Sequence, residues 1–480
     1  MVYCALHKIS VLITCAKSNA GRAEDVLLGR NRARNARCWS PGYRVITAVG
    51  FVSTRLPKIR DLYKRLQHLV TSQPGFTRPQ LWLGEESTSM DVLNAHILEV
   101  PKMNQMRCLA TAAVFCMSPC LDSIAAAETI PIGLVAPISG SVALDGQQEM
   151  AGARFAVDQA NKAGGIRGTQ LELFVEDGEC KPASSTAAAE KLITRNQIIA
   201  LAGGFCSSAT AAMQPISAKY GVPFVNGIST NPALTNPVRP WFFRVKAHDG
   251  IRAKYFSKFI ADAKMKKLAA IAVDDDFGRS AVASFTPALN EKGVEFVLVR
   301  HFAHGEVNYI SLLNAAKGAG ADGLFLVGEV QDAALIMKQY HQLGLKIPVV
   351  AMGSFNTPEF FKVAGANADG IYTAEAWGYG VDYPAAKIFV NNWEAAHSKD
   401  YPGLYATSGY NETQTIIEAL RKAAKPDRAE VKTALEGLTW DSPIGLVKFD
   451  ANHQAHTLIF VTKNENGKGL IVKTFDTSAE

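Results

Sequence analysis

The sequence predicts an α/β fold with two similar lobes, each a parallel sheet covered by helices on both faces. Apolar runs of strand length alternate with helix-length stretches over residues 128–226, and the alternation restarts at Leu268. A helix end, a glycine and a proline that opens a strand recur in YGVPFV at 220–225 and in LGLKIPVV at 343–350. Such alternation builds parallel sheets, and the repeat favours two lobes over one large sheet.

Each element follows from its local pattern. Short apolar runs typical of buried strands occur at 130–136, 171–176, 198–202, 223–226, 268–273, 323–327 and 348–352. Helices are expected between them, at 147–162, 184–194, 209–220, from the Asp274–Asp276 run to about Glu291, and at 332–343. The first helix ends at Gly164-Gly165, which is typical of a C-terminal cap.

Residues 103–127 have the pattern of a secretory signal peptide. Arg107 supplies a positive charge, residues 109–117 form a short apolar run, and Ala125-Ala126-Ala127 provides the small residues for cleavage after Ala127. The apolar run is too short to cross a bilayer as a helix. We therefore expect Glu128–Glu480 to be exported to the periplasm. The alternative is a helix with a hydrophobic stripe.

Residues 1–102 show no sustained helical or strand period. We expect a disordered upstream extension that the native protein lacks, with Met103 or Met106 as the true start. The alternative is an amphipathic or nucleic-acid-binding extension. These residues hold 15 Lys and Arg against 7 Asp and Glu, whereas residues 128–480 hold 34 against 36. Because the basic excess lies upstream, no nucleic-acid partner is expected.

Cysteine usage agrees with export. Of eight cysteines, only Cys180 and Cys206 lie after the predicted cleavage site. Two cysteines in an exported protein of this size can form one disulfide.

Three loops at predicted strand ends carry candidate binding residues: PISGSVALDGQ at 137–147, GGFCSSAT at 203–210 and NGISTNPALT at 226–235. Ligands of doubly wound sheets bind beyond the carboxyl ends of the strands. Glycine lets the backbone approach a ligand, and Ser or Thr at a helix start favours a carboxylate or another small anion. The alternative for Ser207 or Ser208 is simple N-capping.

Motifs for catalysis are missing from residues 128–480: there is no P-loop, GxGxxG after a strand, HExxH or GxSxG. The Asp274–Asp276 run and the His453/His456 pair are more typical of solvated loops than of metal sites. We therefore expect a binding protein that is not an enzyme and has no cofactor or metal.

The opening segment IPIGLVAPISGSVALDGQQEMAGARFAVDQANKAGGIRGTQLEL resembles the periplasmic leucine/isoleucine/valine-binding proteins, which are type I solute-binding proteins of ABC importers. GGFCSSAT, YGVPFVNGISTNPALT, DDDFGRS and TWDSPIGLVKFD continue the match in order. The resemblance implies a type I periplasmic binding fold, with two Rossmann-like lobes joined by three crossover strands. By it we place lobe I at 128–247 plus 375–440 and lobe II at 248–374 plus 441–480.

The resemblance also implies roles for individual residues. Ser207 and Thr230 fall where amino-acid binders hydrogen-bond the ligand α-carboxylate, and Ile228 falls where a main-chain group contacts the α-amino end. Phe277 falls where a tyrosine often comes from the second lobe. Cys180 and Cys206 match the disulfide pair of the family.

Three departures from the family pattern bear on the ligand. Asp145 and Glu329 stand at aromatic positions, and Phe355 stands where a carboxylate would pair with the α-ammonium. A buried, unpaired ammonium costs several kcal/mol. Either Glu329 or Asp145 therefore replaces that carboxylate, or the ligand has no α-amino group and stacks on aromatic residues such as Trp377.

The sequence thus predicts a periplasmic substrate-binding protein, expected to be a monomer, that binds an amino acid or a related small carboxylate or amide. It would deliver this small-molecule ligand to the permease subunits of an ABC transporter. The alternative is a ligand sensor on the same fold that reports to a signalling partner.

Overall fold

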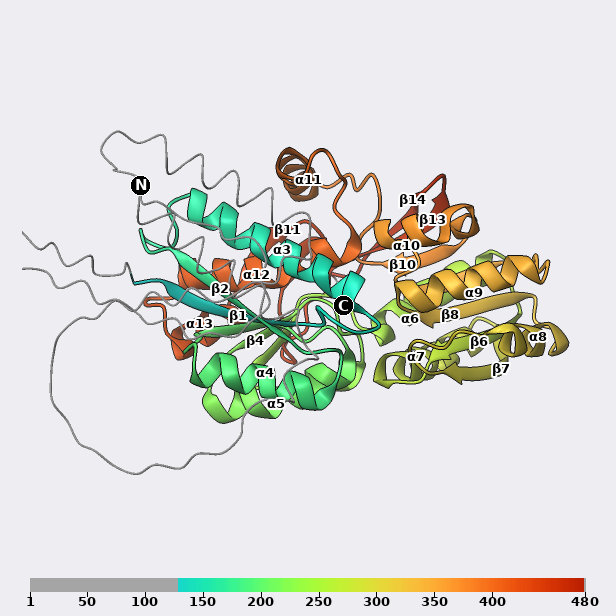
Figure 1. Cartoon of the computed structure of the whole chain (residues 1–480), viewed down its shortest axis with the longest axis horizontal. Coiled ribbons are helices and arrows are strands. Elements are labelled where there is room, and N and C mark those ends of the chain that lie inside the picture. Colours follow the sequence, from blue (N-terminus) through green and yellow to red (C-terminus); the bar gives the residue numbers. More distant parts are fainter. Residues whose placement is uncertain (1–127, 479–480) are drawn as a thin grey trace, which may run out of the picture. The chain divides into compact units, whose positions relative to one another are not determined.

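The computed structural model describes residues 128–478, so the predicted extension and signal peptide lie outside the described residues. The first of its two main sheets is parallel and has the order β2-β1-β3-β4-β5 (Figure 1). Its strands are β1 (Ile130–Ala136), β2 (Leu171–Asp177), β3 (Ala200–Gly203), β4 (Phe224–Asn226) and β5 (Phe242–Arg244). We call this sheet and the helices that cover it the first lobe.

Helices cover both faces of the first sheet because its strands are apolar on both sides. Alternate residues of β1, such as Ile132 and Leu134, pack against one helix pair, while Val135 faces the other pair. The first pair is α3 (Ala143–Lys162) and α12 (Leu404–Lys422), and the second is α4 (Pro182–Thr194) and α5 (Ser207–Tyr220). Figure 1 shows α3 on one side of the sheet and α4 and α5 on the other.

The second sheet has the order β14-β13-β10-β9-β8-β6-β7, with β13 and β14 antiparallel at one edge. Its strands are β6 (Lys267–Val273), β7 (Glu295–Phe302), β8 (Gly323–Gly328), β9 (Val349–Gly353), β10 (Tyr372–Glu375), β13 (Leu458–Glu465) and β14 (Lys468–Asp476). Helices α6 (Asp249–Asp262) and α7 (Asp276–Asn290) cover one face, and α8 (Ile310–Gly318), α9 (Val330–Gln342) and α10 (Pro358–Ala364) cover the other. This sheet and these helices form the second lobe.

The chain passes between the lobes three times, after β5, after β10 and before β13. The second passage leads into α11 (Pro384–Ala396), and the third follows α13 (Arg428–Glu436) and the hairpin of β11 (Thr439–Ser442) and β12 (Gly445–Lys448). Arg244 at the end of β5 donates from Nε to Gln454 Oε1 at 2.6 Å, which ties the first passage to the third.

The predicted α/β class is confirmed, and each predicted strand and helix is present with small shifts at its ends. Strands β5, β7, β10, β13 and β14 and helices α6, α8 and α10–α13 were not predicted. Helix α3 starts at Ala143 rather than at residue 147, so half of the loop expected at 137–147 is helical. Strand β3 starts at Ala200, because residues 198 and 199 precede the ladder. The lobe boundaries drawn from the resemblance stay a prediction. Within the described range, no helix is both long and apolar enough to span a bilayer.

Candidate ligand-binding site

A cavity lies between the two lobes, and loops at the carboxyl ends of strands from both sheets form its walls. Residues 205–207 follow β3, and residues 228–230 follow β4. Asp275 and Phe277 follow β6, and Glu329 follows β8. This is where doubly wound sheets place their ligands.

The first lobe presents neutral hydrogen-bonding groups to the cavity. Ser207 is the first residue of α5, where the leading N–H groups have no intrahelical acceptor and the helix dipole is positive. Thr230 Oγ1 is buried, and its hydroxyl interacts with the buried side chain of Asp249. Both residues are almost fully buried. This wall therefore suits a carboxylate.

Asn226 shapes the loop after β4. Its side-chain oxygen accepts from the Ser229 N–H at 2.9 Å and the Ile228 N–H at 3.3 Å, and its amide nitrogen donates to the Gly203 carbonyl at 2.7 Å. Ile228 lines the cavity, but its N–H is engaged inside the protein.

A glycine lets the chain before α5 approach β1, and a disulfide ties it to the loop after β2. Gly203 has φ +99°, and a Cβ there would lie 2.2 Å from the carbonyl oxygen of Val135. The neighbouring Cys206 forms the predicted disulfide with Cys180. Phe205 adopts a positive φ of 41°, an unfavourable conformation for a bulky residue, and packs against Tyr405 with ring centroids 4.8 Å apart.

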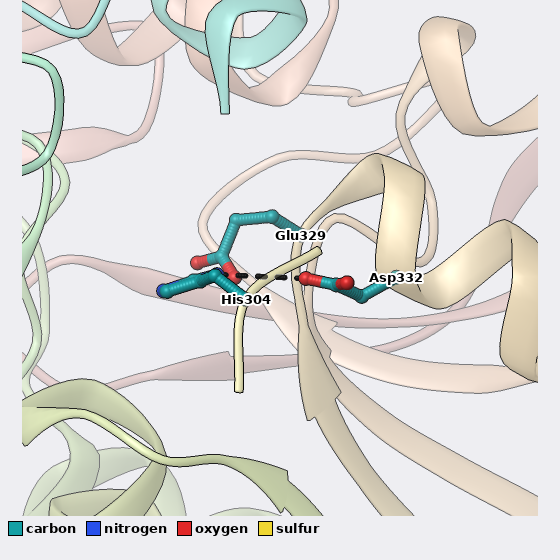
Figure 2. A group of neighbouring side chains, drawn as sticks. All are labelled: His304, Glu329 and Asp332. Atoms are coloured by element: carbon teal, nitrogen blue, oxygen red, sulfur yellow. Dashed lines mark ion pairs between the residues drawn. The ribbon is translucent and has the colours of Figure 1, made fainter. Parts of the chain in front are cut away.

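The second lobe contributes an acidic group of four side chains, which we call the acidic wall: Asp275, His304, Glu329 and Asp332. Figure 2 draws the last three of them. Burial raises the pKa of Glu329 to about 8; His304 opposes this rise, and nearby carboxylates add to it. Burial alone would lower the pKa of His304, but hydrogen bonds to Asp275 and Asp332 outweigh it and raise this pKa to about 10. A cation at the cavity surface would shift Glu329 toward its ionised form, which burial otherwise disfavours.

A second buried charge cluster lies at the passages between the lobes, and we call it the hinge network: Lys246, Asp249, Arg252 and Glu375. Lys246 Nζ lies 2.9 Å from Glu375 Oε2, and Arg252 pairs with both Glu375 and Asp249. Burial alone would raise the pKa of Glu375, but the Arg252 and Lys246 cations outweigh it and lower this pKa. Two cations face two anions here, so the network is balanced.

The structure gathers five of the eight predicted ligand residues around the cavity: Ser207, Ile228, Thr230, Phe277 and Glu329. The other three do not line it. Asp145 instead accepts hydrogen bonds from Val330 N at 3.3 Å and Ser354 Oγ at 2.8 Å across the lobes. Phe355 is buried in the second lobe against Phe360, and the indole N–H of Trp377 donates to the Pro402 carbonyl. Ligand contacts for all eight stay a prediction.

Sequence reasoning missed Tyr405 and the hinge network, three of whose members line the cavity. It assigned the Asp274–Asp276 run to a solvated loop, although Asp275 lines the cavity, and it made no prediction for His304. Asp275 and His304 follow strands of the second sheet, so the strand-end rule that selected Ser207 could have selected them too. No local signal marks Lys246 or Glu375, because the passages between the lobes bring them together.

Comparisons with known proteins agree with this geometry. The family described as "Periplasmic binding protein" matches residues 129–468. The Leucine-, isoleucine-, valine-, threonine-, and alanine-binding protein of Pseudomonas aeruginosa is 27% identical over 326 residues, which cover 68% of this chain and 87% of that protein. The Leu/Ile/Val-binding protein of Escherichia coli is 25% identical over 343 residues, covering 70% and 93%.

Solved structures show the same fold. The branched-chain amino acid transporter substrate binding protein LivJ from Streptococcus pneumoniae, in complex with isoleucine, has a TM-score of 0.67 at 26% identity. It covers 73% of this chain and 99% of that one. A solute binding protein of an ABC transporter from Rhodopseudomonas palustris, in complex with 3,4-dihydroxy benzoic acid, has a TM-score of 0.67 at 22% identity, covering 73% and 98%. These relatives are solute-binding proteins rather than enzymes, and this chain belongs to the periplasmic binding protein family, as its sequence predicts.

Proposed function

We propose that this protein is the periplasmic solute receptor of an ABC importer and holds an amino acid, or a closely related small carboxylate, between its lobes. Export through the leader at 103–127 and docking on membrane permease subunits are parts of this proposal. One observation carries it: the cavity has a carboxylate-binding wall on the first lobe and an acidic wall on the second. The names of the P. aeruginosa and E. coli relatives support an amino-acid ligand.

The ligand carboxylate is placed against the start of α5. The Ser207 and Thr230 hydroxyls supply donors there, and the helix dipole adds favourable potential. A carboxylate at this position also accepts hydrogen bonds from the leading N–H groups of α5, which have no acceptor within the helix.

Of the two candidate partners for the ligand ammonium, we propose Glu329. It lines the cavity, and its Oε2 is buried with no hydrogen bond among the described residues. Asp145 already receives two hydrogen bonds from the second lobe and does not line the cavity. An ammonium beside Glu329 would lower the high pKa of this carboxyl, because it stabilises the ionised form.

Lobe closure follows from the same contacts. A ligand that touches Ser207 on one lobe and Glu329 on the other stabilises the closed form over the open one. Asp145 reaches from α3 of the first lobe to Ser354 of the second and adds a contact between protein groups to the closed form.

The test has two stages. Native mass spectrometry of protein purified without refolding identifies a retained solute, and calorimetry with leucine, a basic amino acid, a short amide and an aromatic acid ranks ligand classes. Glu329→Gln should weaken amino-acid binding by about 2 kcal/mol or more, roughly 30-fold, as expected for truncation of a buried charge pair. Glu359→Gln is the matched control, because this carboxyl is also buried in the second lobe but does not line the cavity.

Tight leucine binding that Glu329→Gln leaves unchanged would contradict the assigned role of Glu329. Aromatic acids are the second candidate ligands, since the rings of Phe205, Phe277 and Tyr405 line the cavity. An aromatic carboxylate brings no cation to Glu329, so Glu329→Gln would then preserve or strengthen binding.

A further inference from the structure

Three potential metal ligands meet at the carboxyl edge of the second sheet. His304 lies in the loop after β7, Glu329 immediately precedes α9, and Asp332 lies in the first turn of α9. One ligand atom from each lies within 4.8 Å of the other two. Figure 2 shows the Glu329 carboxylate beside the His304 ring, with Asp332 facing both. All three belong to one lobe, so lobe closure does not determine their grouping.

The His304 ring is oriented as in many zinc sites. Its Nε2 lies 3.2 Å from Asp275 Oδ2 and donates to that carboxylate, so a metal ion that displaces the Nδ1 proton gains the Nδ1 lone pair as a ligand. Nδ1 faces the cluster, 3.5 Å from Asp332 Oδ2. Histidine ligands of metals almost always donate their second N–H to a carboxylate, a carbonyl or water. Asp275 therefore fits the role of the outer-shell partner.

Both carboxylates also have an oxygen available to bind a cation. Asp332 Oδ1 accepts from Tyr309 Oη at 2.7 Å and from the Gly305 N–H at 3.1 Å, which leaves Oδ2 for a cation. Glu329 is only 5% exposed, and its Oε2 has no hydrogen bond among the described residues. A buried, unpaired carboxylate oxygen is costly. A cation bound at this position removes that cost.

Charge favours a cation as well. The acidic wall holds three carboxyl groups and one histidine, so it is net negative when the carboxyls are ionised even if His304 is protonated. The start of α9 opposes a cation with a partial charge of about +0.5, which is smaller than the carboxylate charge. Tetrahedral bonds of about 2.0–2.2 Å require ligand atoms roughly 3.3 Å apart. Side-chain movement of about 1.5 Å closes the cluster to that spacing.

We propose that His304, Glu329 and Asp332 bind a divalent transition-metal cation of the Zn²⁺ class, leaving one coordination position open toward the ligand cavity. One imidazole and two carboxylates suit Zn²⁺ better than Mg²⁺ or Ca²⁺, which prefer oxygen ligands. Because Glu329 also lines the cavity, the metal competes with the ammonium group of a bound amino acid. This competition rests on the proposed function, whereas metal binding does not.

Calorimetric titration of chelator-treated protein with ZnCl₂ tests the site, and MgCl₂ is the comparison cation. One equivalent of Zn²⁺ should bind, with much weaker binding of Mg²⁺. His304→Gln and Asp332→Asn should each lower the Zn²⁺ affinity at least tenfold, and Asp275→Asn should lower it by about 10- to 100-fold. His456→Gln is the matched control: His456 also pairs with an aspartate, 3.1 Å away, but lies outside the cluster. It should leave the affinity unchanged.

Absence of Zn²⁺ binding, or equal binding by the wild type and His304→Gln, overturns the proposal. Cobalt provides a measurement that needs no variant: Co²⁺ added to the wild type should give visible absorption bands of a low-coordinate site, and absence of these bands also overturns it. Leucine should lower the Zn²⁺ affinity of the wild type. Zn²⁺ binding without binding of any amino acid supports the metal site and contradicts an amino-acid ligand in the proposed function.

Discussion

Loss of one charge from the hinge network should destabilise the protein strongly. Glu375 is fully buried and neutralises Lys246, whose side chain is 4% exposed, and Arg252, whose side chain is 2% exposed. Its Oε1 also accepts from the Gly353 N–H at 2.9 Å, at the edge of the cavity. Glu375→Gln keeps the shape and one acceptor but leaves two buried cations facing only Asp249.

The expected loss follows from the burial of the partners. Removing one member of a buried ion pair costs about 3–5 kcal/mol, because the remaining charge stays desolvated without compensation. With an unfolding entropy of about 2.1 cal/mol/K per residue over roughly 350 residues, 1 kcal/mol corresponds to about 1.4 °C, so Tm should fall by roughly 4–7 °C. Circular dichroism and urea unfolding of ligand-free protein measure both quantities.

Two further variants make this prediction discriminating. Asp382→Asn breaks the exposed ion pair with Lys387, where the aspartate side chain is 83% exposed, and should leave Tm unchanged. Lys246→Met combined with Glu375→Gln removes one of the two cations left without a partner, and it should recover part of the lost stability. A Glu375→Gln protein that melts within 2 °C (about 1.5 kcal/mol) of the wild type would refute the reasoning, as would a double variant no more stable than the single one.

Three other changes test separate parts of the fold. Gly152→Ala should lower the free energy of unfolding, measured in urea, by several kcal/mol, because the added Cβ would lie 1.8 Å from a carbonyl oxygen of α12. Gly318→Ala is the control: the space around this glycine is open, so the substitution should be neutral or stabilising. Replacing Cys180 and Cys206 by serine opens a loop with a sequence separation of 26, and denaturation should show a loss of about 3.5 kcal/mol. Burial raises the pKa of Asp145 to about 7, so the native state loses stability as the pH rises above the ordinary pKa of aspartate. The stability of Asp145→Asn relative to the wild type should therefore rise by up to roughly 4 kcal/mol between pH 4 and 8.5. A stability difference that does not change with pH would contradict this prediction.

Local sequence patterns predicted the strand–helix order because each element carries its own signal. Residues 130–136 are apolar on both faces, as a central parallel strand requires, and the structure has a strand with those bounds. Helix α3 was predicted to start late, because Ala143–Gly146 follows a glycine- and serine-rich loop that resembles a turn. The edge strands β13 and β14 received no prediction, since they pair antiparallel outside the repeating unit.

Site residues could be predicted where they lie in the loop just after a strand end. Ser207 and Thr230 follow β3 and β4 and lie at the cavity. Side-chain direction was not predictable: Phe355 follows β9 as closely as Ser354, yet it packs into the second lobe while Ser354 bonds Asp145. Trp377 lies on a passage between lobes, where packing against Tyr401 and Pro402 fixes its ring.

Charge balance separates the two buried polar clusters by role. In the hinge network each cation has an anionic partner within the protein. The buried charges of this network are therefore compensated without a ligand, as expected of a structural role. The acidic wall has more carboxyl groups than cations, and Glu329 retains an unpaired oxygen at the cavity surface. A group that the fold leaves unsatisfied at a cavity costs stability, and only a bound partner recovers that cost. The carboxyl excess beside Glu329 therefore points to a cationic group on whatever fills the cavity.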